Sequence, residues 1–156
     1  MKSHRIKFQK ILAVLLAILA LVGGLFGLCR AVASARAYDI APLTDERLAE
    51  LDLTGITHLM IVAHPDDETL WGGAHIADGG YLVVCITNGY NATRSAEFQA
   101  VMQASNNVGL ILSYPDKVAG KRDDWTHVRS QIQTDLEKVM TYQPWEDIVT
   151  LSLIHI

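Results

Sequence analysis

Short apolar runs alternate with more polar stretches along most of the chain. Residues 58–63, 81–89 and 110–114 are almost wholly apolar and are bounded by turn residues, which is typical of strands buried on both faces. A fourth run, 147–153, has the same character. The stretches between these runs predict helices, most clearly at 126–142, where apolar residues recur at steps of three and four. The other predicted helices are 68–80, ending at Gly79 and Gly80, 94–109, ending at Gly109, and a short helix capped by Thr44.

Strands that alternate with helices predict an α/β fold. Such βαβ units are right-handed and build a parallel sheet covered by helices on both faces. We therefore expect a Rossmann-like, three-layer domain with a mostly parallel sheet that is incomplete at its C-terminal end. Sites in these sheets form beyond the carboxyl ends of the strands. Because the first strand ends at Ala63, residues 64–68 lie where a site is expected.

The N-terminal part of the chain has a different pattern. Residues 11–29 contain no charge and follow a basic leader at 1–10. At about 1.5 Å per residue, a helix of this length spans a bilayer. We expect a transmembrane anchor with the rest of the chain outside the cytoplasm, followed by a linker with a short helix at 30–56. A cleaved signal peptide is the alternative, because residues 33–37 contain small residues suited to cleavage.

Charge is distributed unevenly between these two parts. The first 37 residues carry six cations and no acid, whereas the whole chain has a net charge of −4. The remaining residues are therefore strongly acidic. This balance argues against a nucleic-acid-binding surface.

The sequence "HPDDE" at residues 64–68 places three acids side by side after the first strand. One interpretation is a helix N-terminus, with Asp66 as cap and the next two acids favoured by the helix dipole. That interpretation leaves His64 unexplained. His64 and Asp67 are three residues apart around a turn and are suitable ligands for zinc. Asp66 would then be free to accept a proton from water, and the cation would offset the repulsion between the acids.

Several short motifs together resemble a known family. "AHPDDE" after a buried strand, then "TLWGG", then a strand that ends in "TNG", is similar to the PIG-L or LmbE-like family of zinc-dependent N-deacetylases. The resemblance covers residues 57–150. It implies that His64 and Asp67 bind Zn²⁺ and that Asp66 is the general base. It also implies substrate-binding roles for Arg94, three residues before Glu97, and for Asp116 of "YPD".

One element implied by the resemblance is missing. The family's third zinc ligand is a histidine in a downstream segment, and no such segment occurs before residue 156. None of the remaining histidines after the apolar run is assigned to the metal; these are His58, His75, His127 and His155.

The last six residues, "LSLIHI" at 151–156, form an atypical tail. The DNA sequence CTGTCTCTTATACACATC encodes these six residues. It resembles a transposase adapter end used in sequencing libraries. We therefore expect a truncated chain with a foreign end.

The expected function is zinc-dependent removal of an acetyl group from an N-acetylglucosamine-type substrate or glycan outside the cytoplasm. The missing ligand predicts impaired activity for this chain. Two alternatives remain open. One is another metal-dependent amidase on the same scaffold, and the other is a non-catalytic, membrane-anchored fragment.

Overall fold

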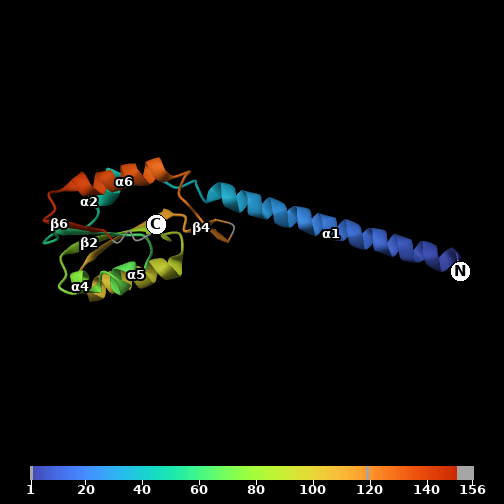
Figure 1. The fold of residues 1–156 in the computed structure, drawn as a ribbon, viewed down its shortest axis with the longest axis horizontal. Coiled ribbons are helices and arrows are strands. Elements are labelled where there is room, and N and C mark those ends of the chain that lie inside the picture. Colours follow the sequence, from blue (N-terminus) through green and yellow to red (C-terminus); the bar gives the residue numbers. More distant parts are fainter. Residues whose placement is uncertain (1, 119, 151–156) are drawn as a thin grey trace. The chain divides into compact units, whose positions relative to one another are not determined.

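A computed structural model describes residues 2–118 and 120–150. The chain divides into two compact units, Met1–Arg36 and Ala37–Ile156. The first unit is a single helix, α1 (Lys2–Arg36) (Figure 1). Its segment Lys10–Val32 has a mean hydropathy of 2.8. By length and composition this helix is consistent with a signal sequence or a single membrane anchor.

The second unit is built on a four-stranded parallel sheet. Its strands are β1 (His58–Val62), β2 (Tyr81–Thr87), β3 (Val108–Tyr114) and β6 (Asp147–Thr150), in the order β3-β2-β1-β6. Every neighbouring pair runs parallel, with His58 opposite both Tyr81 and Asp147. The predicted α/β, Rossmann-like fold is confirmed.

Helices cover both faces of this sheet. In Figure 1, α2 (Asp45–Ala49) and α6 (Arg129–Tyr142) lie on one face, and α4 (Gly73–Ile76) and α5 (Ala92–Ala104) lie on the other. Successive strand residues point to opposite faces, so each strand contributes to two cores. Beneath α2 and α6 the core includes Leu59, Ile61, Leu82, Val84 and Ile132, and beneath α4 and α5 it includes Met60, Val62, Val83, Phe98 and Met102.

Residues 30–56 were expected to form a linker with a short helix, and the part of this segment after residue 36 contributes to the first of these cores. Leu43 and Leu48 are buried there. The short helix is α2, and its predicted cap is observed, because the Thr44 hydroxyl accepts a hydrogen bond from the Arg47 N–H at 3.3 Å. The folded domain therefore begins soon after α1.

The predicted helix at 68–80 is wrong in one respect. The structure has two short helices there, α3 (Asp67–Leu70) and α4, separated at Trp71 and Gly72. A Cβ atom on Gly72 would lie 2.8 Å from the Met60 Sδ and 2.9 Å from the Glu68 carbonyl oxygen. Glycine lets the backbone approach the sheet this closely, and two adjacent glycines disfavour a continuous helix.

The predicted helix at 94–109 is also displaced. It occupies α5 and ends before Asn106, which adopts the left-handed conformation with φ of 55°. Gly109 does not end the helix; it lies inside β3, beneath Phe98 and Met102 of α5. Asparagine tolerates the left-handed region, so Asn106 performs the role that the sequence suggested for glycine.

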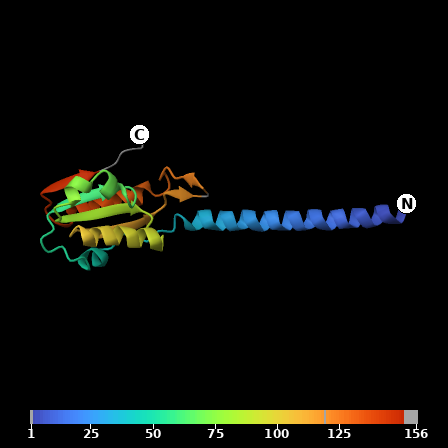
Figure 2. The ribbon, with the colours of Figure 1, turned by 90° about the horizontal axis from the view of Figure 1, so that it is seen from below.

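A small hairpin was not predicted. It is formed by β4 (Lys117–Val118) and β5 (Lys121–Arg122), which pair antiparallel and protrude from the three-layer body (Figure 2). Two-residue strands of mostly charged residues have no alternating apolar pattern to predict them. The tail at 151–156, including His155 and the end of the predicted fourth strand, lies outside the described residues.

Candidate functional site

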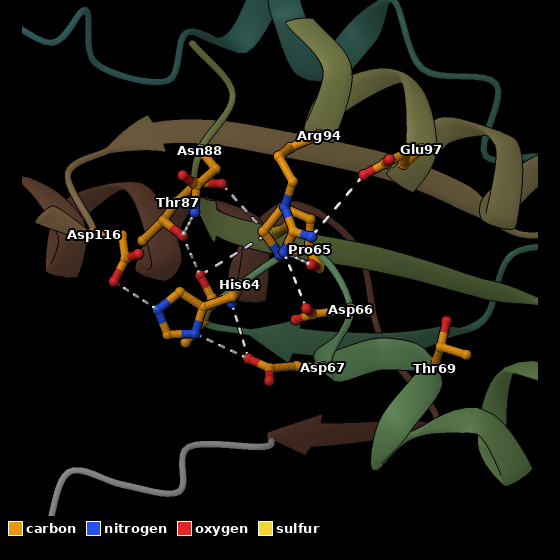
Figure 3. A network of polar contacts seen from close by, with 12 residues as sticks. His64, Pro65, Asp66, Asp67, Thr69, Thr87, Asn88, Arg94, Glu97 and Asp116 are labelled. Carbon is orange, nitrogen blue, oxygen red and sulfur yellow. Dashed lines mark hydrogen bonds and ion pairs between the residues drawn. The ribbon is translucent and has the colours of Figure 1, made fainter. Parts of the chain in front are cut away.

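Residues of the candidate site, both predicted and unpredicted, follow the carboxyl ends of three neighbouring strands. His64 follows β1, Asn88 follows β2, and Asp116 follows β3 (Figure 3). The ends of β1 and β2 are fastened together, because the Thr87 hydroxyl donates to the Ala63 carbonyl oxygen at 2.8 Å and the Thr87 N–H donates to the same oxygen at 3.1 Å. This edge of the sheet is where a parallel α/β fold places its ligands.

The side chains of the three adjacent acids make different contacts. The Asp67 carboxylate turns back and accepts the His64 N–H at 2.9 Å. Glu68 is 1 % exposed, and it accepts the Asp66 N–H at 2.9 Å and the Thr69 hydroxyl at 3.1 Å. The buried Glu68 carboxylate therefore stabilises the turn through these two hydrogen bonds. The Asp66 side chain, about half exposed, is left for other contacts.

Asp66 has an unusual backbone. Its φ is 131°, in the region that L residues rarely adopt, and its side chain makes no capping hydrogen bond to α3. Asp66 thus occupies the N-cap position of α3, as one interpretation expected, but its side chain does not cap the helix. A non-glycine residue in this region costs on the order of 1–3 kcal/mol, so surrounding contacts must hold it.

Arg94 supplies two of those contacts. It lies in the first turn of α5, where the Asn91 side chain accepts the backbone N–H groups of Thr93 and Arg94 at 3.1 and 3.3 Å. Its guanidinium donates to the Asp66 carboxylate at 3.0 Å and to the Pro65 carbonyl oxygen. The hydrogen bond to Asp66 raises the pKa of Arg94. Glu97, the partner suggested by spacing, is more distant, at 4.0 Å.

The His64 ring lies between two carboxylates. Its Nδ1 is 3.4 Å from an Asp67 oxygen, and its Nε2 is 3.2 Å from an Asp116 oxygen. The His64 side chain is 24 % exposed, and those of Asp67 and Asp116 are each 19 % exposed. Asp116, which is 52 residues from His64 along the chain, is thus brought into direct contact with the motif (Figure 3).

These residues surround a polar hollow of about 410 Å³. Four of the five predicted site residues line it: His64, Asp66, Arg94 and Asp116. The fifth, Asp67, contacts His64. Sequence reasoning missed the other lining residues, which are Asn88, Asn91 and Arg122. Asn88 could have been predicted in the same way as His64, because it directly follows a parallel strand. Arg122 could not, because it belongs to the hairpin that the sequence did not predict.

Other histidines lie away from this hollow. His58 is at the amino end of β1, as expected, with its Nδ1 3.0 Å from the Asp147 carboxylate. His75 contacts the Tyr81 hydroxyl at 3.3 Å, and the His127 ring packs against Tyr38. Across residues 2–118 and 120–150, no group of three or more His, Cys, Asp or Glu side chains is arranged to hold a metal ion.

Comparison with protein-family models, with curated proteins and with solved structures returned no match. The resemblance to the PIG-L or LmbE-like family accordingly rests on the motifs in residues 63–116.

Proposed function

We propose that this protein is a zinc-dependent hydrolase that removes the acetyl group from an N-acetylglucosamine-type substrate outside the cytoplasm. One observation carries the proposal. The residues that the motifs single out come from three separate segments, and they meet around one polar hollow at the carboxyl edge of the sheet.

The contacts of the His64 ring support its proposed role as a metal ligand. Metal-binding histidines commonly donate their second ring N–H to a carboxylate, which fixes the ring. With Nδ1 beside Asp67 and Nε2 beside Asp116, His64 has this arrangement. Within the part of the chain that the structure describes, neither carboxylate has a lysine or arginine partner, so a cation beside them is electrostatically favoured.

His64 and Asp67 would hold the zinc ion, which when bound supplies a Lewis acid that lowers the pKa of water. A catalytic zinc usually has three protein ligands, so the donor set needs one more. In this proposal Asp116 orients His64, a role in addition to the expected contact with the sugar hydroxyls.

Asp66 would act as the general base. Its carboxylate lines the hollow and takes a proton from the attacking water, and the proton then passes to the departing amine. Arg94 positions this carboxylate through its hydrogen bonds to Asp66 and Pro65. The strained backbone at Asp66 directs the side chain toward Arg94 and away from α3.

The substitution Asp66→Asn tests this role. Loss of a general base is expected to lower kcat for deacetylation by roughly 10²–10⁴-fold, while zinc content stays unchanged because Asp66 is not a ligand. Kinetics on N-acetylglucosamine substrates and metal analysis of the same samples measure both. Asp78→Asn, at an exposed acid that does not line the hollow, is the matched control. Equal turnover by the Asp66 and Asp78 variants would refute the assignment.

A second candidate is a non-catalytic, sugar-binding fragment held at a membrane. The incomplete ligand set among the described residues favours it. Such a protein would bind N-acetylated sugars in the same hollow without zinc and without turnover. Another amidase on the same scaffold would instead hydrolyse acyl amides in preference to N-acetylated sugars.

A further inference from the structure

The hollow contains one more cation than its internal contacts use. Arg94 is paired with Asp66. Arg122, from β5, also lines the hollow, but it has no ion pair or side-chain hydrogen bond with any residue that the structure describes. An unpaired guanidinium at the rim of a polar hollow is available to a ligand.

A second cation lies beside Arg122 on the same hairpin. Lys117 of β4 lies directly opposite Arg122. Residues opposite each other in an antiparallel pair share a face, and like charges in that position destabilise the pair. Lys117 likewise has no acidic partner in the described part of the chain. An anion bound between the two side chains would remove their repulsion.

The acids close to the hairpin are engaged elsewhere. Asp116 contacts His64 at 3.2 Å. Asp123 accepts the Tyr38 hydroxyl at 2.5 Å and the Trp125 N–H at 2.7 Å. Asp124 accepts the Thr126 N–H at 3.0 Å. None of these carboxylates pairs with Lys117 or Arg122, although the domain as a whole is acidic.

The hairpin is also held at a fixed base. The Asp123 N–H donates to the Asp116 carbonyl oxygen at 2.9 Å, and the Trp125 indole donates to the Pro115 carbonyl oxygen at 2.7 Å. The backbone that carries Arg122 is therefore tied to the end of β3, next to Asp116. A subsite on this hairpin would have a defined position relative to the proposed catalytic residues.

We propose that Arg122, assisted by Lys117, forms a subsite for an oxyanion that is attached to the amino-sugar substrate. This inference rests on the proposed function, and it narrows the substrate class from N-acetylated sugars to those that carry a phosphate or carboxylate. The subsite gives a role to two of the seven cations after residue 37, Lys117 and Arg122.

Isothermal titration on the full chain in a nonionic detergent tests the subsite independently of zinc and turnover. The ligands are inorganic phosphate, N-acetylglucosamine, N-acetylglucosamine 1-phosphate and N-acetylmuramic acid. We expect at least one anionic sugar to bind about tenfold or more tightly than the neutral sugar, and added salt to reduce this preference. The two anionic sugars distinguish a phosphate from a carboxylate. Equal affinity for the neutral and both anionic sugars would overturn the inference.

Two variants locate the effect. Arg122→Gln should weaken phosphate binding by about tenfold or more, because a charge-assisted contact is lost. Lys121→Gln removes the same charge from the same hairpin, but Lys121 pairs with Val118 and lies on the other face, so its effect should be under about twofold. Equal losses in both variants would show non-specific attraction and would contradict the subsite. Circular dichroism on each variant checks that the fold is intact.

These results separate the two proposals. Phosphate binding that depends on Arg122, with neither zinc binding nor deacetylation, would retain the subsite and refute the proposed function. Deacetylation of neutral and anionic sugars at equal kcat/KM, unaffected by Arg122→Gln, would retain the function and refute the subsite.

Discussion

At the scale of single residues, the acidic turn shows how neighbouring carboxylates can serve separate purposes. Glu68 is buried and satisfies the backbone of the turn, Asp67 contacts His64, and Asp66 contacts Arg94. The crowding of like charges is thus relieved by giving each acid a different partner. A second buried acid, Asp135 on the buried side of α6, is also satisfied by hydrogen bonds.

Asp135 is 2 % exposed and joins three segments of the fold. It accepts the Tyr114 hydroxyl at 2.6 Å and the Leu43 N–H at 3.0 Å. Tyr114→Phe removes one of these donors and leaves the carboxylate under-satisfied, so we expect the free energy of unfolding at pH 8 to fall by about 1–3 kcal/mol. Urea unfolding followed by circular dichroism measures this change. A loss below about 0.5 kcal/mol would show that the bond contributes little.

The same tyrosine predicts a dependence on pH. Burial, followed by the hydrogen bond to Asp135, raises the pKa of Tyr114 above its ordinary value near 10. A raised pKa in the folded state means that the stabilisation is fully present below about pH 10 and is lost as the pH rises further. The stability difference between the wild type and Tyr114→Phe should therefore narrow above pH 10.

At the scale of elements, the contact between α5 and β3 depends on the absence of a side chain at Gly109. A Cβ atom there would lie 2.7 Å from the Met102 Cγ and 2.8 Å from the Phe98 Cε1, and both of these side chains are buried. Gly109→Ala should therefore destabilise the domain by about 1–3 kcal/mol through overpacking.

Gly73→Ala is the control for that change. Gly73 begins α4, and a Cβ atom there would meet nothing within 4 Å. We expect this variant to be neutral or more stable by up to about 1 kcal/mol, because alanine favours the helix. Thermal unfolding of both variants measures the contrast. A Gly109 variant as stable as the Gly73 variant would show that α5 can shift away from the sheet.

The elements also show what the sequence could and could not predict. The buried strands were predictable because burial on both faces requires a continuous apolar run. Helix α6 was predictable because its apolar residues recur every three or four positions. The break between α3 and α4 was not predictable. It depends on the close packing of Gly72 against Met60, a residue of β1. His64, Asp66 and Asp67 were found from one motif, but the contact between His64 and Asp116 depends on tertiary structure.

At the scale of the whole molecule, α1 is consistent with a signal sequence or a single membrane anchor. Its segment Lys10–Val32 is apolar throughout and long enough to cross a bilayer. We propose that it remains attached as an anchor. Alkaline carbonate extraction should then leave the chain at full mass in the membrane fraction. A mature N-terminus near residue 37 would instead identify a cleaved signal sequence.

A paired substitution checks that this helix is responsible. Leu19→Arg with Val22→Arg places two charges near the middle of the segment, at a cost of about 2.5–3.5 kcal/mol each. The variant should be released into the soluble fraction or fail to insert, whereas Leu19→Phe with Val22→Phe should behave as the wild type. Retention of the arginine variant in carbonate-washed membranes would contradict an anchoring role.

Zinc content tests the central claim most directly. Elemental analysis of the purified full chain, after incubation with zinc and removal of the excess, should give close to one zinc ion per chain. His64→Ala should lose the metal, and His75→Ala, a control outside the hollow, should retain it. Absence of zinc from the wild type, or equal zinc in the His64 and His75 variants, would contradict a metal-dependent hydrolase at this site.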